Sequence, residues 1–134
     1  MKNIITIIAF VLILAIFLTQ ITINELTHTK LVYCEEVVNT TMQQAREEGC
    51  ITTAMVNDMK TKIAAKAGCE EDDVVITSSI PITMPAERGN LIDYKVEYFV
   101  KGVIGGGSIL GIQDADNKMK KVISGAVVSE YVGP

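Results

Sequence analysis

Residues 4–23 constrain the fold of this chain more than any other part of its sequence. They include no charged residue, no glycine and no proline, and isoleucine, leucine, valine and phenylalanine fill most positions. A helix of this length is about 30 Å long, which matches the hydrocarbon core of a bilayer. Because such a helix is apolar on every side, it has to leave water, either in lipid or in the dry centre of an assembly of many copies.

A secretory signal peptide is an alternative explanation, since Lys2 precedes an apolar run. Signal peptides end in a small-x-small cleavage site, and residues 19–26 contain no Ala-x-Ala pattern. The sequence also continues to Glu48 without glycine or proline, so no helix-stopping residue occurs before Gly49. We therefore expect one helix of more than forty residues, apolar first and amphipathic later.

Two apolar stripes predict a helical hairpin on either side of Gly49. Their members recur every three or four residues: Leu31, Cys34, Val38, Met42 and Ala45, then Ile51, Met55, Met59, Ile63 and Ala67. Gly68 closes the second segment, and Thr52 or Thr53 can cap its start. Two such helices joined by a short turn are expected to pack antiparallel, stripe against stripe.

The hairpin brings two of the three cysteines to the same level. Measured from the turn, Cys34 lies about 21 Å along the first helix and Cys69 about 25 Å along the second. Both fall on or beside the facing stripes, so we expect a Cys34–Cys69 disulfide in an oxidising compartment. Three reduced, buried thiols are the alternative, and the lack of a C-x-x-C pattern argues against a metal site.

Strand patterns follow the acidic turn of residues 70–73. Residues 74–80 are rich in β-branched side chains, residues 91–100 alternate apolar and polar positions, and residues 118–132 form a third candidate strand with a candidate bulge at Gly125. The apolar sheet face requires cover, which the helices supply. The sequence therefore predicts an α+β fold, with a hydrophobic stem (residues 1–30) and a small head domain (residues 31–134) packed on an antiparallel sheet.

Composition and motifs argue against several functions. The formal net charge of −4 disfavours a nucleic-acid partner, because phosphate neutralisation requires a basic face. The glycine run at residues 105–107 lacks the lysine of a phosphate-binding loop, so we expect a turning loop there. His28 is the one histidine, and no nucleophile motif accompanies it. We therefore expect no enzyme activity and no cofactor.

Two further motifs are short and unspecific. Asp114, Asp116 and Asn117 contain oxygen ligands but lack the spacing of a calcium-binding EF-hand, so a solvated loop explains them and no metal site is expected. Asn39 begins an N-glycosylation sequon within a segment expected to be helical. We keep Asn39 as a candidate glycosylation site.

An apolar helix that continues as an amphipathic helix and leads to a small antiparallel sheet resembles the type IV pilin superfamily. The carboxy-terminal part is similar to the TadE-like, tight-adherence pilins and pseudopilins: a glycine followed by an alternating strand at residues 89–98, a hydrophobic glycine-rich connection, and a last strand of small residues ending in an acidic one at residues 124–130. Pilins usually carry glutamate at the fifth mature position, where this chain has Ile5, and archaeal-type pilins resemble it in lacking that glutamate. No basic leader precedes the apolar run, so Met1 is either a processed end or the start of an uncleaved anchor.

We therefore expect a structural subunit of an extracellular pilus-like filament that serves cell adhesion. The resemblance implies three partners: other copies of the chain, the membrane before assembly, and the pilus assembly machinery. Burial of the stem in the filament stabilises each subunit by roughly 1.5 to 3 kcal/mol for each large side chain. The expected filament core comprises Ile4, Ile5, Ile8, Phe10, Leu12, Leu14, Ile16 and Phe17.

The location of Lys2 before the apolar run places the start of the chain in the cytoplasm and the remainder outside, by the positive-inside rule. Two other functions stay open. One is a minor pseudopilin or assembly factor that remains in the membrane and primes the filament. The other is a membrane-anchored ligand-binding domain, which should be monomeric without its stem.

Overall fold

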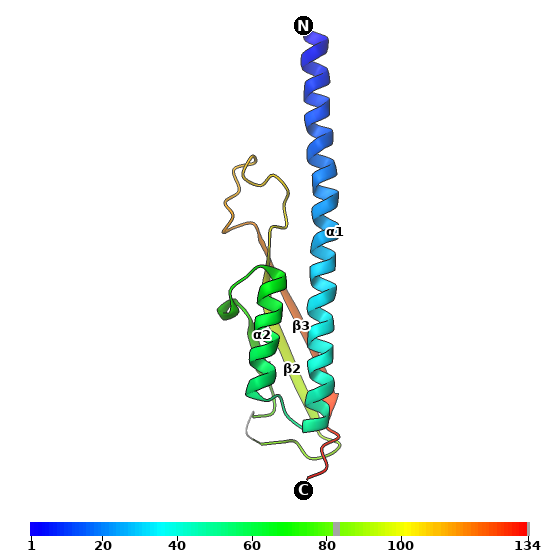
Figure 1. Cartoon of the computed structure of the whole chain (residues 1–134), viewed down its shortest axis with the longest axis vertical. Coiled ribbons are helices and arrows are strands. Elements are labelled where there is room, and N and C mark those ends of the chain that lie inside the picture. Colours follow the sequence, from blue (N-terminus) through cyan, green and yellow to red (C-terminus); the bar gives the residue numbers. More distant parts are fainter. Residues whose placement is uncertain (82–83, 134) are drawn as a thin grey trace.

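One uninterrupted helix dominates the computed structural model, which describes residues 1–81 and 84–133. This helix, α1 (Lys2–Glu48), is 47 residues long and ends at Gly49, whose φ of 77° lies in the left-handed region. Figure 1 shows that the amino-terminal part of α1 extends away from the rest of the chain, whereas the remainder lies beside the other elements and the loop between β2 and β3. The expected continuous helix is therefore confirmed.

The second helix, α2 (Thr53–Ala67), runs back along the second half of α1 (Figure 1). Its N-cap is Thr52, whose hydroxyl oxygen accepts a hydrogen bond from the Met55 amide at 3.3 Å. At the other end, Gly68 adopts a left-handed φ of 79° and donates its amide proton to the Ala64 carbonyl. The cap and both stop signals explain why the chain forms the expected hairpin.

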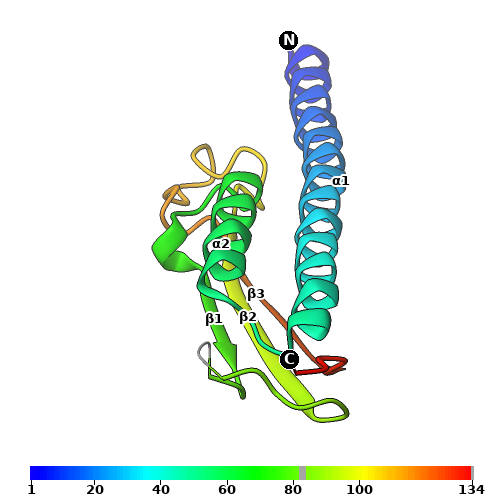
Figure 2. The same ribbon diagram turned by 60° about the horizontal axis from the view of Figure 1, so that its bottom comes forward.

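The sheet follows a short 3-10 turn, η1 (Glu71–Asp73). Its strands are β1 (Val75–Ser78), β2 (Leu91–Lys101) and β3 (Lys118–Val128), which are antiparallel in the order β1-β2-β3. Figures 1 and 2 show both helices on the same side of this sheet. The predicted α+β architecture is therefore confirmed.

Two details of the third strand differ from the prediction. Gly125 is not a bulge, because β2 and β3 pair in one unbroken register that places it opposite Tyr94. A Cβ atom at this position would lie 2.7 Å from the Tyr94 hydroxyl oxygen, so glycine makes room for the ring. The strand also ends at Val128 rather than at residue 132, and the next residue, Ser129, donates its amide to the Asn90 carbonyl and its hydroxyl to the Ala86 carbonyl.

The core lies between the helical stripes and the inner face of β2. Tyr98, Met42 and Met59 are among its largest fully buried side chains, and Cys34 is buried with them. The remaining buried apolar members come from both helices, β2 and the connecting segments: Val38, Ala45, Ile51, Met55, Ile63, Ala64, Ala67, Val74, Ala86, Ile92, Val96 and Val100. Both predicted stripes therefore contribute to one core.

The two helix-ending glycines provide a matched test of crowding. An alanine Cβ at Gly49 would lie 2.8 Å from the Tyr131 Cβ and 2.9 Å from the Ala86 carbonyl oxygen, whereas one at Gly68 would meet no described atom within 4 Å. Both glycines have nearly the same left-handed φ, so the backbone cost of alanine should be the same at each. Gly68→Ala should lower the free energy of unfolding by this cost alone, about 1 kcal/mol. Gly49→Ala should cost about 1 to 3 kcal/mol more. Urea unfolding in detergent measures both, and equal losses would contradict the crowding.

The outer face of the sheet carries an ion-pair cluster that predicts acid sensitivity. Glu97 accepts hydrogen bonds from Lys120 and Lys95, with nitrogen–oxygen distances of 2.7 Å and 2.5 Å, and these lysines lower the pKa of its carboxyl from 4.5 to about 2. Because the folded pKa lies below the unfolded one, this stabilisation is present above pH 4.5 and is lost as the pH falls toward 2. We expect Glu97→Gln to flatten the decline in melting temperature over that range, and Lys120→Met to act in the same direction. An unchanged decline in Glu97→Gln would refute the assignment.

Candidate functional site

The exposed apolar part of α1 is the candidate functional site. The residues predicted as the filament core lie along it with 42% to 67% of their surfaces exposed. Within the described residues, α1 is the one helix long and apolar enough to cross a membrane, and none of its most apolar window is buried against the head. An apolar surface of this size requires an apolar environment outside the subunit.

The threonines of the stem do not require water. The hydroxyls of Thr6, Thr19 and Thr22 donate hydrogen bonds to the carbonyls four residues earlier, with oxygen–oxygen distances of 3.0, 2.8 and 3.2 Å. Threonine commonly makes this bond when a helix lies in an apolar medium. These three threonines are therefore compatible with lipid or with a dry helical bundle.

Gln20 binds the stem to a loop that the sequence places more than eighty residues away. This segment, which we call the glycine loop (residues 102–117), connects β2 to β3. The Gln20 side-chain amide donates to the Val103 carbonyl at 3.1 Å, and its oxygen accepts from the Gly105 amide at 2.9 Å. A Cβ atom at Gly105 would lie 2.7 Å from the Ile23 Cδ1 atom, so a larger residue there would require the Ile23 side chain to move.

Asn117 closes the base of the glycine loop. Its side-chain oxygen accepts from the Ile104 amide at 2.8 Å, and its side-chain nitrogen donates to the Ile104 carbonyl at 2.9 Å. Asn117 therefore has a structural role in the predicted turning loop. Asp114 and Asp116 do not join a metal-binding cluster, since residues 1–81 and 84–133 contain no group of three His, Cys, Asp or Glu side chains that could hold an ion.

The Cys34 and Cys69 thiols lie close to the buried Tyr98 hydroxyl. Burial raises the pKa of both thiols, and their proximity contributes to the rise at Cys34. Burial and the adjacent Cys34 thiol also raise the pKa of Tyr98 well above its usual value, and its hydroxyl has no hydrogen-bond partner of ordinary geometry among the described residues. Cys34 and Cys69 are thiols in the structure, so their pairing stays a prediction.

We expect the Cys34–Cys69 disulfide when the protein is recovered from an oxidising compartment. Closing a loop of this length should stabilise the head by about 3 to 4 kcal/mol. Non-reducing peptide mapping by mass spectrometry should recover the bridged pair, and a reductant should lower the melting temperature. Cys69→Ser should remove this sensitivity. Full alkylation of Cys34 and Cys69 without a reductant would show that both remain thiols.

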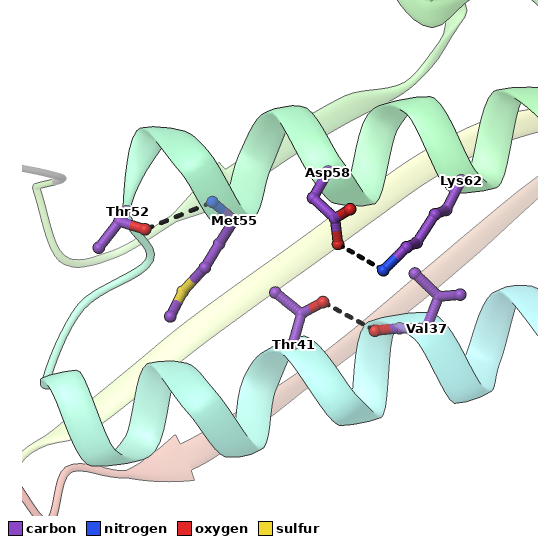
Figure 3. Close-up of polar contacts among 6 residues, drawn as sticks. All are labelled: Val37, Thr41, Thr52, Met55, Asp58 and Lys62. Carbon is purple, nitrogen blue, oxygen red and sulfur yellow. Dashed lines mark hydrogen bonds and ion pairs between the residues drawn. The ribbon is translucent and has the colours of Figure 1, made fainter.

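The groove between the helices is lined mainly by polar side chains, and three of them, Thr41, Asp58 and Lys62, have polar partners (Figure 3). Asp58 and Lys62 form an ion pair at 2.7 Å, and the Thr41 hydroxyl donates to the Val37 carbonyl at 2.8 Å. Asn39 lies exposed on this part of α1, and its glycosylation stays a prediction. The groove is therefore a weaker candidate for a binding site than the stem.

No family model matches this chain, and searches of curated proteins and of solved structures found no significant match. The structure brings the glycine loop against Gln20, near the end of the exposed apolar run of α1. It also places Cys34 near Cys69. Sequence reasoning missed the contact between the loop and Gln20, although Gln20 stands out as a large polar side chain within the apolar run.

Proposed function

We propose that this chain is a structural subunit of an extracellular pilus-like filament of the type IV pilin kind and polymerises through its stem. One observation carries the proposal: the apolar half of α1 projects beyond the head with its large side chains exposed (Figure 1). About fifteen such side chains yield tens of kcal/mol of gross stabilisation when copies of the helix cover one another.

The distribution of polar surface supports the division between filament core and outer wall. The outer sheet face carries the Glu97 ion pairs, whose lysine side chains are about half exposed, and Arg46 pairs with Glu130 at the far end of the head. These charges favour a position in water, whereas the stem favours exclusion from it. Copies can be arranged so that every stem is buried and every head remains in water. They form an open helical polymer when the rotation that relates neighbouring subunits does not close into a ring.

A membrane-inserted precursor is the second element of the proposal. The stem is long enough to span a bilayer, and the hydroxyls of Thr6, Thr19 and Thr22 are paired within the helix. Subunits stored in the bilayer would enter the filament by exchanging lipid contacts for contacts with other stems. The similarity to TadE-like pilins in layout and in the two carboxy-terminal strands agrees with such a route and with pilus assembly machinery as a partner.

Electron microscopy of material sheared from cells tests the proposal, together with mass spectrometry of the subunit. Filaments whose main component is this chain are the expected result, and the terminal residue found by mass spectrometry would show whether a leader is removed. Detection solely in membranes as a minor species would instead support a priming pseudopilin. A monomeric head that binds a small ligand would support the anchored binding domain.

A further inference from the structure

The glycine loop exposes an apolar tip beside the stem. Ile109 and Leu110 are 79% and 61% exposed, and Ile104 is also exposed. Residues 102–113 contain no charged side chain. Figure 1 shows the loop extending from the ends of β2 and β3 along α1, in the direction of the start of the helix. An exposed, uncharged tip of this kind indicates a contact with an apolar partner.

The hydrogen bonds of Gln20 hold this loop at one level of the stem. In the membrane-inserted precursor they therefore also determine the depth of the loop relative to the bilayer. The apolar run ends at Ile23, and the next residues are Asn24 and Glu25, so the edge of the hydrocarbon core falls close to Ile23. Gly105 packs against Thr19 and Ile23. The loop therefore reaches the level at which the lipid core begins, although the rest of the head lies farther along α1.

Basic side chains lie at the base of the loop, on the side of the head. The Lys30 ammonium donates to the Lys101 carbonyl at 3.4 Å. Lys101 lies opposite Lys118 in the backbone register, where β2 ends and β3 begins. Lys30 is about 10 Å beyond Ile23 along the helix, which is within reach of lipid headgroups for a long side chain. An uncharged apolar tip with charged residues at its base, Asp114 and Asp116 as well as the lysines, matches the order of acyl chains and polar headgroups in a leaflet.

We propose that the glycine loop is a second membrane contact, whose tip at Ile109 and Leu110 enters the outer leaflet while the stem spans the bilayer. This inference rests on the membrane-inserted precursor of the proposed function. The contact orients the head on the membrane surface, because Gln20 joins the loop to the stem. In the precursor, before other copies cover the stem, the tip is continuous with the part of the stem that lies in the bilayer, which favours a lipid surface over a second copy of the chain.

Tryptophan substitutions provide the test, since the natural chain contains no tryptophan. The full chain is reconstituted at low density in phosphatidylcholine vesicles that contain some phosphatidylglycerol, with or without bromine on the acyl chains. Ile109→Trp reports on the loop tip and Phe10→Trp reports on the stem. Val132→Trp is the matched control, because Val132 is 72% exposed and belongs to the carboxy-terminal segment, whose end Figure 1 shows at the opposite end of the head from the glycine loop.

Brominated lipid should quench the Ile109→Trp and Phe10→Trp reporters, and the loop reporter should be quenched at least about threefold more than the Val132→Trp control. Adding Leu110→Asp to the Ile109→Trp chain should reduce this quenching, because a charge at the tip opposes entry into lipid. Circular dichroism of each variant in the same vesicles verifies that the head is folded.

Three results would overturn the loop contact. Equal quenching at positions 109 and 132, with position 10 quenched, would leave the loop in water while the filament proposal stands. If the Ile109→Trp reporter is shielded from solvent only when the vesicles contain protein at high density, the tip contacts a second copy of the chain rather than lipid. An unquenched Phe10→Trp reporter would show that the stem is outside the bilayer, and both the precursor and the loop contact would then be rejected.

Discussion

Leu12→Asp should abolish filament formation and leave the head folded. Leu12 lies in the middle of the exposed apolar run, far from any residue of the head core. Moving an aspartate to the centre of a membrane helix costs about 2.5 to 3.5 kcal/mol. In a filament the same charge is repeated in every subunit, so neighbouring stems would each face buried carboxylates. Electron microscopy of sheared material should show no filaments.

The matched control is Leu12→Met, which retains an apolar side chain of similar volume and should assemble normally. The melting temperature of the head, measured in detergent, should be the same for both variants and for the natural chain. Normal filaments from Leu12→Asp would remove the stem from the assembly mechanism. A lower melting temperature in Leu12→Asp alone would mean that the stem also stabilises the head, and the loss of filaments would then have two causes.

The fold could be predicted because its main elements follow from local periodicity. Stripes of three- and four-residue spacing specified both helices, and Gly49 and Gly68 marked their ends. The alternation of residues 91–100 specified β2, whose inner face is buried. These patterns are consequences of burying one face of each element, so they remain readable in a single sequence.

The contacts that could not be predicted join residues that are distant in sequence. The hydrogen bonds between Gln20 and the glycine loop depend on how the hairpin places β2 beside α1, which no local pattern encodes. A lone glycine in a strand pattern predicts a bulge at Gly125, whereas the register shows that this glycine accommodates the Tyr94 ring across the sheet. The contacts of Ser129 with Ala86 and Asn90, just after the end of β3, are likewise between segments distant in sequence.

Met59→Ala should destabilise the head by about 2 to 5 kcal/mol, because it leaves a cavity in a packed core. Met59 is fully buried between the helices and the sheet, and its side chain is one of the largest in the core. Met84→Ala is the matched control, since Met84 is 69% exposed and its replacement should change stability by less than about 0.5 kcal/mol. Urea unfolding of the full chain in detergent should show a lower midpoint for Met59→Ala at an unchanged slope.

Met59→Ala and Leu12→Asp together separate the two parts of the subunit. If the stem drives assembly and the head folds on its own core, then Met59→Ala lowers stability and reduces filament number only as far as unfolded subunits are degraded. Filaments formed from the surviving Met59→Ala subunits should have the same diameter as those of the natural chain, because the stem is intact. A different subunit spacing in those filaments would show that the head core also determines how subunits pack. Equal stability of Met59→Ala and Met84→Ala would contradict the burial of Met59.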